Sequence, residues 1–166
     1  MATKPEAWQT GPVPGVPSLL QPVAHALMNC AEQLEDAIRD LTPAQLAARP
    51  ANAASIDFHV RHAIGSLDRL FTYARGELLS DSQRAYLSSE KALSGLTSRE
   101  LIDLFNGAVD KALSQLRATD ESSLTDARTI GRAQLPSTVI GLLFHGAEHT
   151  ARHTGQVVTM SKIVSA

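Results

Sequence analysis

The sequence predicts an all-α protein, a four-helix bundle preceded by a Pro-rich extended arm at the N-terminus. Apolar residues recur every three or four positions over four long segments, which is the period of an amphipathic helix. No segment shows the apolar and polar alternation of a strand, and the chain has no internal repeat. Four amphipathic helices bury their apolar faces by packing side by side, so these observations together favour a bundle.

Length and composition fit one ordinary globular domain. The chain has 166 residues, of which 43% are hydrophobic and 19% charged, enough to bury a substantial core. We expect an arm at residues 1–17 and a single bundle domain at residues 18–166. The arm is expected to be extended because proline and glycine are concentrated in it, at Pro5, Gly11, Pro12, Pro14, Gly15 and Pro17.

Charge and hydropathy exclude several classes of protein. The formal net charge is −2 and the Lys and Arg residues are scattered, so no basic surface for nucleic acid is indicated. No apolar stretch approaches the roughly 20 residues of a membrane-spanning helix. The first 17 residues lack the basic-then-apolar order of a signal peptide, so we expect a cytoplasmic protein. The single cysteine, Cys30, excludes an internal disulfide and is expected to be a buried small residue.

The first two helices are delimited by their apolar pattern and by proline, serine and glycine. The first is expected from Leu19 to Leu41, followed by a connector that Pro43 and Pro50 keep out of the helical conformation. The second is expected to begin with Ser55 as its N-cap and to end near Gly76.

The third helix has a capping box, in which Thr97 and Glu100 bond reciprocally to each other's backbone N–H groups. Before it, a short helix is expected around residues 84–90. After it we expect a polar connection from Ala118 to Leu135, and then a final helix that starts at residues 136–137 and reaches about Ile163.

The last helix carries half of the six histidines, His145, His149 and His153, each four residues apart. Residues four apart lie about 40° from each other around a helix, with Cβ atoms roughly 6 Å apart. Two imidazoles at this spacing can converge on a metal ion about 2.0–2.1 Å from each nitrogen. A third ligand must come from another helix, and the other histidine cluster holds His59 and His62.

His62 is the better candidate for the third ligand. It shares a face of the second helix with Ser66, Arg69 and Tyr73, a polar stripe that faces either solvent or a pocket. His59 lies about 60° away, so it either neighbours the site or points to solvent. Three imidazoles leave coordination positions open, as in catalytic sites. Imidazole suits zinc, nickel, copper and iron, and zinc or nickel are the natural candidates here.

The histidine motifs resemble those of a known family. The run from His149 through His153 to Gln156 resembles the last-helix signature of the DinB/YfiT-like superfamily, and His62 with its two neighbours resembles that family's ligand position on the second helix. The resemblance spans residues 19–163. It implies a four-helix bundle with one zinc or nickel ion on His62, His149 and His153, while His145 matches no ligand position.

Other polar residues near these motifs have lesser expected roles. Three are candidates for lining the pocket: His145, Gln156 and His59. Glu148 lies about 100° from His149, so we expect it on the helix flank or at a subunit contact rather than as a general base. Three arginines on helix flanks are expected to be solvated: Arg69, Arg75 and Arg152.

The function expected from the residues is metal-assisted activation of a thiol or water nucleophile toward a small-molecule substrate. Members of the family that the chain resembles include transferases of low-molecular-weight thiols such as bacillithiol or mycothiol, so a thiol S-transferase is favoured. The alternatives are a metal-dependent hydrolase or isomerase and a non-catalytic metal-binding or dimerisation bundle. A di-iron bundle would need Glu-x-x-His on two helices, which the sequence lacks. The resemblance also favours a homodimer, which light scattering would test.

Overall fold

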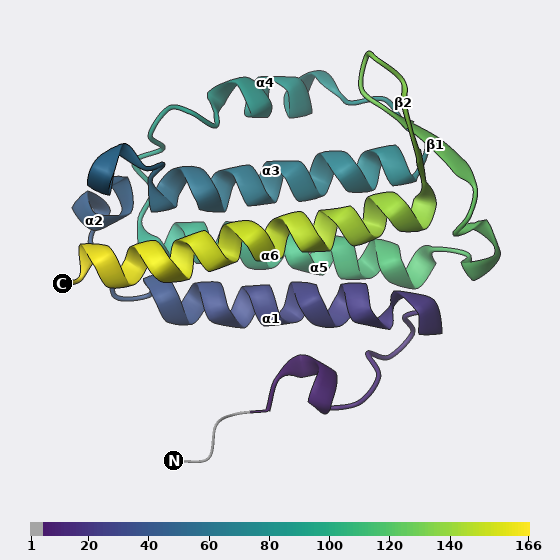
Figure 1. The fold of residues 1–166 in the computed structure, drawn as a ribbon, viewed down its shortest axis with the longest axis horizontal. Helices are drawn as coiled ribbons and strands as arrows, with labels where there is room; N and C mark the ends of the chain where they lie inside the picture. The colour runs from purple at the N-terminus through teal and green to yellow at the C-terminus, as the bar shows by residue number, and fades with distance from the viewer. Residues whose placement is uncertain (1–4) are drawn as a thin grey trace.

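Four long helices lie side by side and make up most of the chain (Figure 1). The computed structural model describes residues 5–166. The long helices are α1 (Gln21–Ile38), α3 (Ile56–Ala74), α5 (Ser98–Ala118) and α6 (Val139–Val164). Two short helices, α2 (Pro43–Ala47) and α4 (Asp81–Ser89), and a small antiparallel sheet of β1 (Ala127–Ile130) and β2 (Leu135–Thr138) lie in the connections. Single 3-10 turns occur at Ala7–Gln9, Ser18–Leu20, Pro50–Asn52 and Glu121–Ser123.

The helix starts that the sequence predicts at Ser55 and Thr97 are confirmed. Ser55 Oγ accepts a hydrogen bond from the backbone N–H of Phe58 at 3.2 Å. Thr97 Oγ1 accepts from the N–H of Glu100 at 3.3 Å, and the Glu100 carboxylate accepts from the N–H of Thr97 at 2.8 Å. Each bond satisfies a backbone donor that the first helical turn leaves free. At the other end of α3, Gly76 has a φ of +76°, the left-handed conformation that stops a helix.

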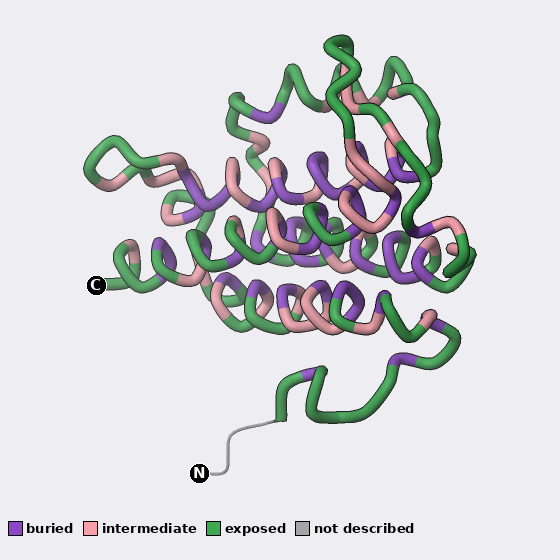
Figure 2. Tube along the Cα trace, turned by 45° about the vertical axis from the view of Figure 1, so that its right-hand side comes forward, coloured by how far each residue is buried: buried purple, intermediate pink, exposed green. Residues whose placement is uncertain are grey.

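The long helices bury their apolar faces against one another. In Figure 2 the buried residues follow the inward sides of the helices and the exposed residues follow the outer sides. Helix α6 packs on α1 and α3, and α5 packs on the same two helices. All four contribute to the largest fully buried side chains, which include Leu27, Leu34, Ile56, Phe105, Leu116, Leu142 and Leu143. In residues 5–166 no helix combines the length and the apolar character needed to cross a membrane.

The boundaries of the first helix and its connector differ from the sequence-based expectation. The first helix was expected from Leu19 to Leu41, whereas α1 runs from Gln21 to Ile38 after a 3-10 turn. The connector contains helix α2, because Thr42 and Gln45 form a capping box of their own, with the Gln45 amide oxygen accepting from the Thr42 N–H at 2.9 Å. The expected short helix near residues 84–90 is α4, which begins at Asp81 with Ser80 as its N-cap.

The expectation of no strands was wrong for one segment. The supposed polar connection and the start of the final helix form a hairpin, in which Ile130 pairs with Leu135 and Thr129 with Pro136. The final helix therefore starts at Val139 rather than at Pro136, and Thr138 is its N-cap. Strands of four residues are too short to show a clear alternation, and a proline is tolerated in a strand that has a free edge.

The Pro-rich segment at the N-terminus, expected to be an extended arm, packs on the helices. The Gln21 side chain donates to the carbonyl oxygens of Val13 and Val16, at 3.0 and 2.9 Å. Both valines are buried. Arg117 on α5 donates from Nε to the Pro14 carbonyl at 3.1 Å. The described part of this segment is thus fastened to both α1 and α5.

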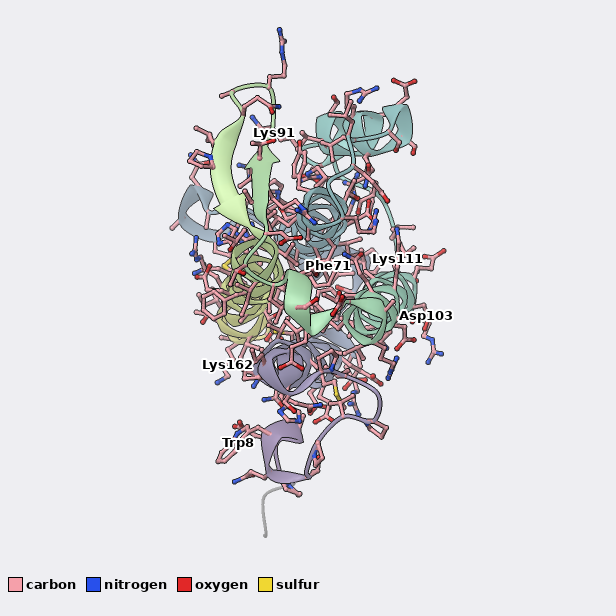
Figure 3. All side chains as sticks on the ribbon, turned by 90° about the vertical axis from the view of Figure 1, so that its right-hand side faces the viewer. Trp8, Phe71, Lys91, Asp103, Lys111 and Lys162 are labelled. Atoms are coloured by element: carbon pink, nitrogen blue, oxygen red, sulfur yellow. The ribbon has the colours of Figure 1, made fainter. Side chains whose placement is uncertain are left out.

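A glycine on α6 allows close packing against α3. A Cβ atom built on Gly146 would lie 2.9 Å from Cε2 of Phe71, closer than real Cβ contacts. Figure 3 shows Phe71 in the interior between the helices. Only a residue without a side chain fits here while α3 and α6 keep their present separation. In contrast, a Cβ atom on Gly155, nine residues further along α6, would meet nothing within 4 Å.

We expect Gly146→Ala to destabilise the protein by about 1–3 kcal/mol, because the added methyl group overpacks the α3–α6 contact. Gly155→Ala is the matched control on the same helix, and it should stabilise the protein by roughly 0.5–1 kcal/mol through the better helix propensity of alanine. Urea unfolding of the two variants measures both effects. Equal effects of the two substitutions would contradict the close-packing argument.

Candidate metal centre

Three imidazoles from two helices converge at the contact between α3 and α6. His62 on α3 and His149 and His153 on α6 each offer one ring nitrogen, and these atoms lie within 4.8 Å of one another. The ring centroids are 4.6–5.2 Å apart, and His62 Nε2 lies 3.1 Å from His149 Nε2. All three side chains are partly exposed, so the cluster is open on one side. The structure therefore brings together the three histidines that the sequence singles out.

His59, which the sequence leaves between the pocket and solvent, also reaches this cluster. Its Nδ1 lies 2.9 Å from Nδ1 of His153. One of these two nitrogens therefore donates a hydrogen bond from its N–H group, and the other accepts that bond. The neighbouring ring of Phe58 stacks on His62 at 5.3 Å with an interplanar angle of 10°. The α3 side of the cluster is thus walled by an aromatic ring and a fourth imidazole.

The other two candidate pocket residues lie toward solvent. His145 is exposed, with its ring 5.6 Å from that of His149 and its Nδ1 3.4 Å from the Glu148 carboxylate. Gln156 is exposed near the C-terminal end of the histidine stripe. Glu148 itself forms an ion pair with Arg152 at 2.5 Å on the flank of α6. His145 therefore lies at the rim of the cluster.

A buried carboxylate adjoins the site, and no sequence motif pointed to it. Glu90, just after α4, is only 2% exposed, and its Oε2 lies 2.7 Å from Nδ1 of His62. Its other oxygen accepts from Arg69 at 2.6 Å. The expectation that Arg69 is solvated was wrong, because α4 and the segment after it cover this side of α3 and enclose the arginine with Glu90. The one available signal was the placement of Arg69 on the same helical face as His62.

Burial and the charges of neighbouring histidines lower the pKa of three imidazoles in the cluster. Burial, followed by the charges of His62, His149 and His59, lowers the pKa of His153 to about 4. Burial and the neighbouring His62 also lower the pKa of both His149 and His59 from their usual value. These three imidazoles are therefore unprotonated near pH 7, which is the form that binds a metal ion.

The pKa of Glu90 is also shifted, in the direction that favours its charged form. Burial by itself would raise this pKa, but hydrogen bonds from His62 and Arg69 and the charge of Arg69 lower it below the usual range. Glu90 is therefore an ionised carboxylate, able only to accept hydrogen bonds.

The donor set fits a divalent transition metal. Three imidazole nitrogens facing one another suit zinc, nickel, copper or iron, and they leave coordination positions open. The Nδ1 atom of His149 is buried without a hydrogen-bond partner among the described residues. The orientation of this ring therefore depends on packing and on the contact of its Nε2 with His62.

A separate cavity of about 470 Å³ lies between α3, α4 and α5. Its exposed surface is mainly apolar, with Leu67 and Phe71 in its lining, and the lining also includes Asp103 and Lys111 of α5, both labelled in Figure 3. None of the cluster histidines lines it. The cavity is therefore distinct from the histidine cluster.

We expect the metal-free protein to lose stability as the pH falls from about 6.5 to about 4. In this range the unfolded chain takes up protons on histidines that the folded cluster holds neutral, so the equilibrium shifts toward unfolding. Above the ordinary histidine pKa of the unfolded chain, neither state takes up these protons, so this loss of stability is absent. Urea unfolding at several pH values measures the slope, and His153→Gln should make the slope shallower. Parallel curves for wild type and variant would contradict the lowered pKa of His153.

Comparisons with known proteins agree with this fold. No curated protein matches the chain. Among solved structures it is similar to the crystal structure of a conserved protein from Enterococcus faecalis, with a TM-score of 0.72, 19% sequence identity, and coverage of 88% of this chain and 96% of that one. At this identity the likeness shows the fold alone. The sequence matches the DinB superfamily over residues 26–157, well over half of its length, so the chain belongs to the DinB superfamily.

Proposed function

We propose that this protein is an enzyme with one metal ion, zinc or nickel, held by His62, His149 and His153. The observation that carries the proposal is the convergence of three ring nitrogens from α3 and α6 within 4.8 Å, on a side that is open to solvent. The lowered pKa values of His149 and His153 support it, because these two ligands need no deprotonation near pH 7. We infer that the four long helices form a four-helix bundle of the DinB/YfiT type that keeps the ligands in place.

The chemistry that we propose is the transfer of a low-molecular-weight thiol to a small electrophile. A bound divalent ion would acidify a thiol or a water molecule in an open coordination position. The thiol proton passes to solvent, the sulfur forms a bond to the electrophilic carbon, and the leaving group departs with its electron pair. This reaction needs no strong base from the protein, since a thiolate is already a potent nucleophile.

The surroundings of the cluster favour such a nucleophile. Both nearby carboxylates are engaged: Glu90 bonds to His62 and Arg69, and Glu148 pairs with Arg152. The chain's own contribution is therefore to orient the imidazoles and to leave their partly exposed side chains reachable from solvent. A water nucleophile, as in a hydrolase, would benefit more from a free base beside it.

Protein purified without added metal and without a histidine tag is expected to contain about one zinc or nickel ion per chain, as measured by elemental analysis. His62→Ala and His149→Ala should each reduce this content to well below one, because each removes a ligand. His145→Ala is the matched control, since His145 is an exposed histidine on the same stripe of α6, and it should keep its metal. Full metal content in His149→Ala would contradict the assignment of the site.

A thiol substrate is tested with the metal-loaded protein, an alkylating electrophile and a series of thiols that includes bacillithiol, mycothiol and glutathione. We expect saturable consumption of one thiol above the uncatalysed rate, and its loss in His149→Ala. A protein that binds metal but consumes none of the thiols would contradict the transferase proposal. Ester hydrolysis without thiol consumption would instead identify a hydrolase, and no turnover would identify a metal-binding module.

A further inference from the structure

We propose that Glu90 is a positioning residue that fixes His62 in the tautomer whose free Nε2 lone pair points at His149 and His153. The consequence for metal affinity rests on the proposed function, whereas the tautomer itself is a property of the metal-free chain. The residue lies in the segment that follows α4, 28 positions along the chain from His62, and it has no part in the histidine motifs.

The geometry of the pair assigns the proton. Glu90 Oε2 lies 2.7 Å from His62 Nδ1, and a carboxylate accepts hydrogen bonds without donating them, so Nδ1 carries the proton. In the neutral imidazole, the form that binds a metal ion, the opposite nitrogen, Nε2, is then bare. It lies 3.1 Å from His149 Nε2 and faces the space that the three imidazoles share.

A second series of hydrogen bonds favours the same tautomer. Arg69 donates from one terminal nitrogen to Ser66 Oγ at 3.2 Å, which occupies a lone pair of that hydroxyl. Ser66 Oγ lies 3.3 Å from His62 Nε2, so its own proton has an acceptor there if Nε2 is bare. The other terminal nitrogen of Arg69 donates to Glu90 at 2.6 Å. One buried guanidinium thus orients the partners of both nitrogens of His62.

The chain around Glu90 is fastened to α3 on both sides. Arg61, itself buried, donates to the backbone carbonyls of Ser89 and Ala92, and thereby brackets Glu90. Asp57 accepts hydrogen bonds from the backbone N–H and the hydroxyl of Ser94. The Arg61 bonds, which lie directly on either side of Glu90, keep it at 2% exposure, where it cannot swing away from His62 into solvent, whereas the Asp57 bonds hold the segment four residues further on.

Helix α3 leaves room for this carboxylate at a glycine. A Cβ atom on Gly65 would overlap the Glu90 carboxylate and the Arg69 guanidinium, and it would lie 2.8 Å from the ring of Tyr86. Since Gly65 stands three residues after His62, the bare backbone at this point is what admits the buried charges beside the ligand. Burying two charges is favourable only when they are paired and hydrogen-bonded, as they are here.

The decisive variant is Glu90→Gln, which keeps the shape of the side chain and leaves one acceptor oxygen for two donors. Arg69 is charged and should keep that oxygen, so the amide NH2 group faces Nδ1 of His62 and donates to it. We expect His62 to change from the Nδ1–H to the Nε2–H form in ¹⁵N-histidine NMR spectra of the metal-free protein. Zinc affinity, measured by competition with a chelator, should fall by about 10- to 100-fold.

Two further variants separate positioning from a structural role. Asp57→Asn is the matched control, because it removes a buried charge that holds the same segment but contacts no histidine. It should leave the His62 tautomer and the zinc affinity unchanged. Adding Arg69→Met to Glu90→Gln removes the competing donor, so the amide oxygen can turn to His62. The double variant should recover the Nδ1–H form and most of the affinity.

An unchanged His62 tautomer in Glu90→Gln would overturn the proposal, as would an equal loss of zinc affinity in Asp57→Asn. The NMR measurement uses metal-free protein, so it decides the positioning role even if wild type fails to bind zinc. That failure would contradict the proposed function alone. A changed tautomer together with unchanged zinc affinity would overturn the link between Glu90 and the metal.

Discussion

The close packing of α3 against α6 is the constraint on which the rest of the site depends. Two of the clustered imidazoles lie on α6, and their common face follows from their spacing in the sequence. The third lies on α3 and reaches the other two only because the axes of the two helices are close together. Gly146 permits that approach by giving its space to Phe71. Because cores are packed to near-crystalline density, a change of one methyl group at this contact is transmitted to the neighbouring turns, which carry His149 and the facing His62. The packing of the core therefore also sets the distances between the histidines of the site.

Much of the helical architecture could be predicted from the sequence, since each long helix carries a period of three to four over at least four turns. The caps at Ser55 and Thr97 were readable because they depend on side chains within three residues. The hairpin at residues 127–138 was not, because a strand of four residues is shorter than the window in which alternation can be recognised. Its pairing depends on contacts across the turn rather than on local propensity.

The same distinction applies to the candidate site. His149 and His153 stand one turn apart, so their common face follows from helix geometry, and the choice of His62 over His59 followed from a polar stripe on α3. Glu90 could not be found in this way, because the short helix expected around residues 84–90 gives no indication of which side chains face α3. Its position results from long-range hydrogen bonds made by Arg61 and other α3 side chains, which leave no local signature in the sequence. Arg69 was misjudged for the same reason, as burial by a distant segment is invisible to a helical projection.

The thiol transfer that we propose would expose the protein to alkylating compounds, and a reactive sulfhydryl of its own would compete with the substrate. The single cysteine of this chain, Cys30, is 3% exposed in the core on α1. Burial raises its pKa, although the neighbouring Thr154 side chain acts in the opposite direction, so the group stays protonated as well as inaccessible. Only the thiolate reacts readily with electrophiles. Under the proposed activity, the burial of this thiol would protect the protein against alkylation by its own substrates.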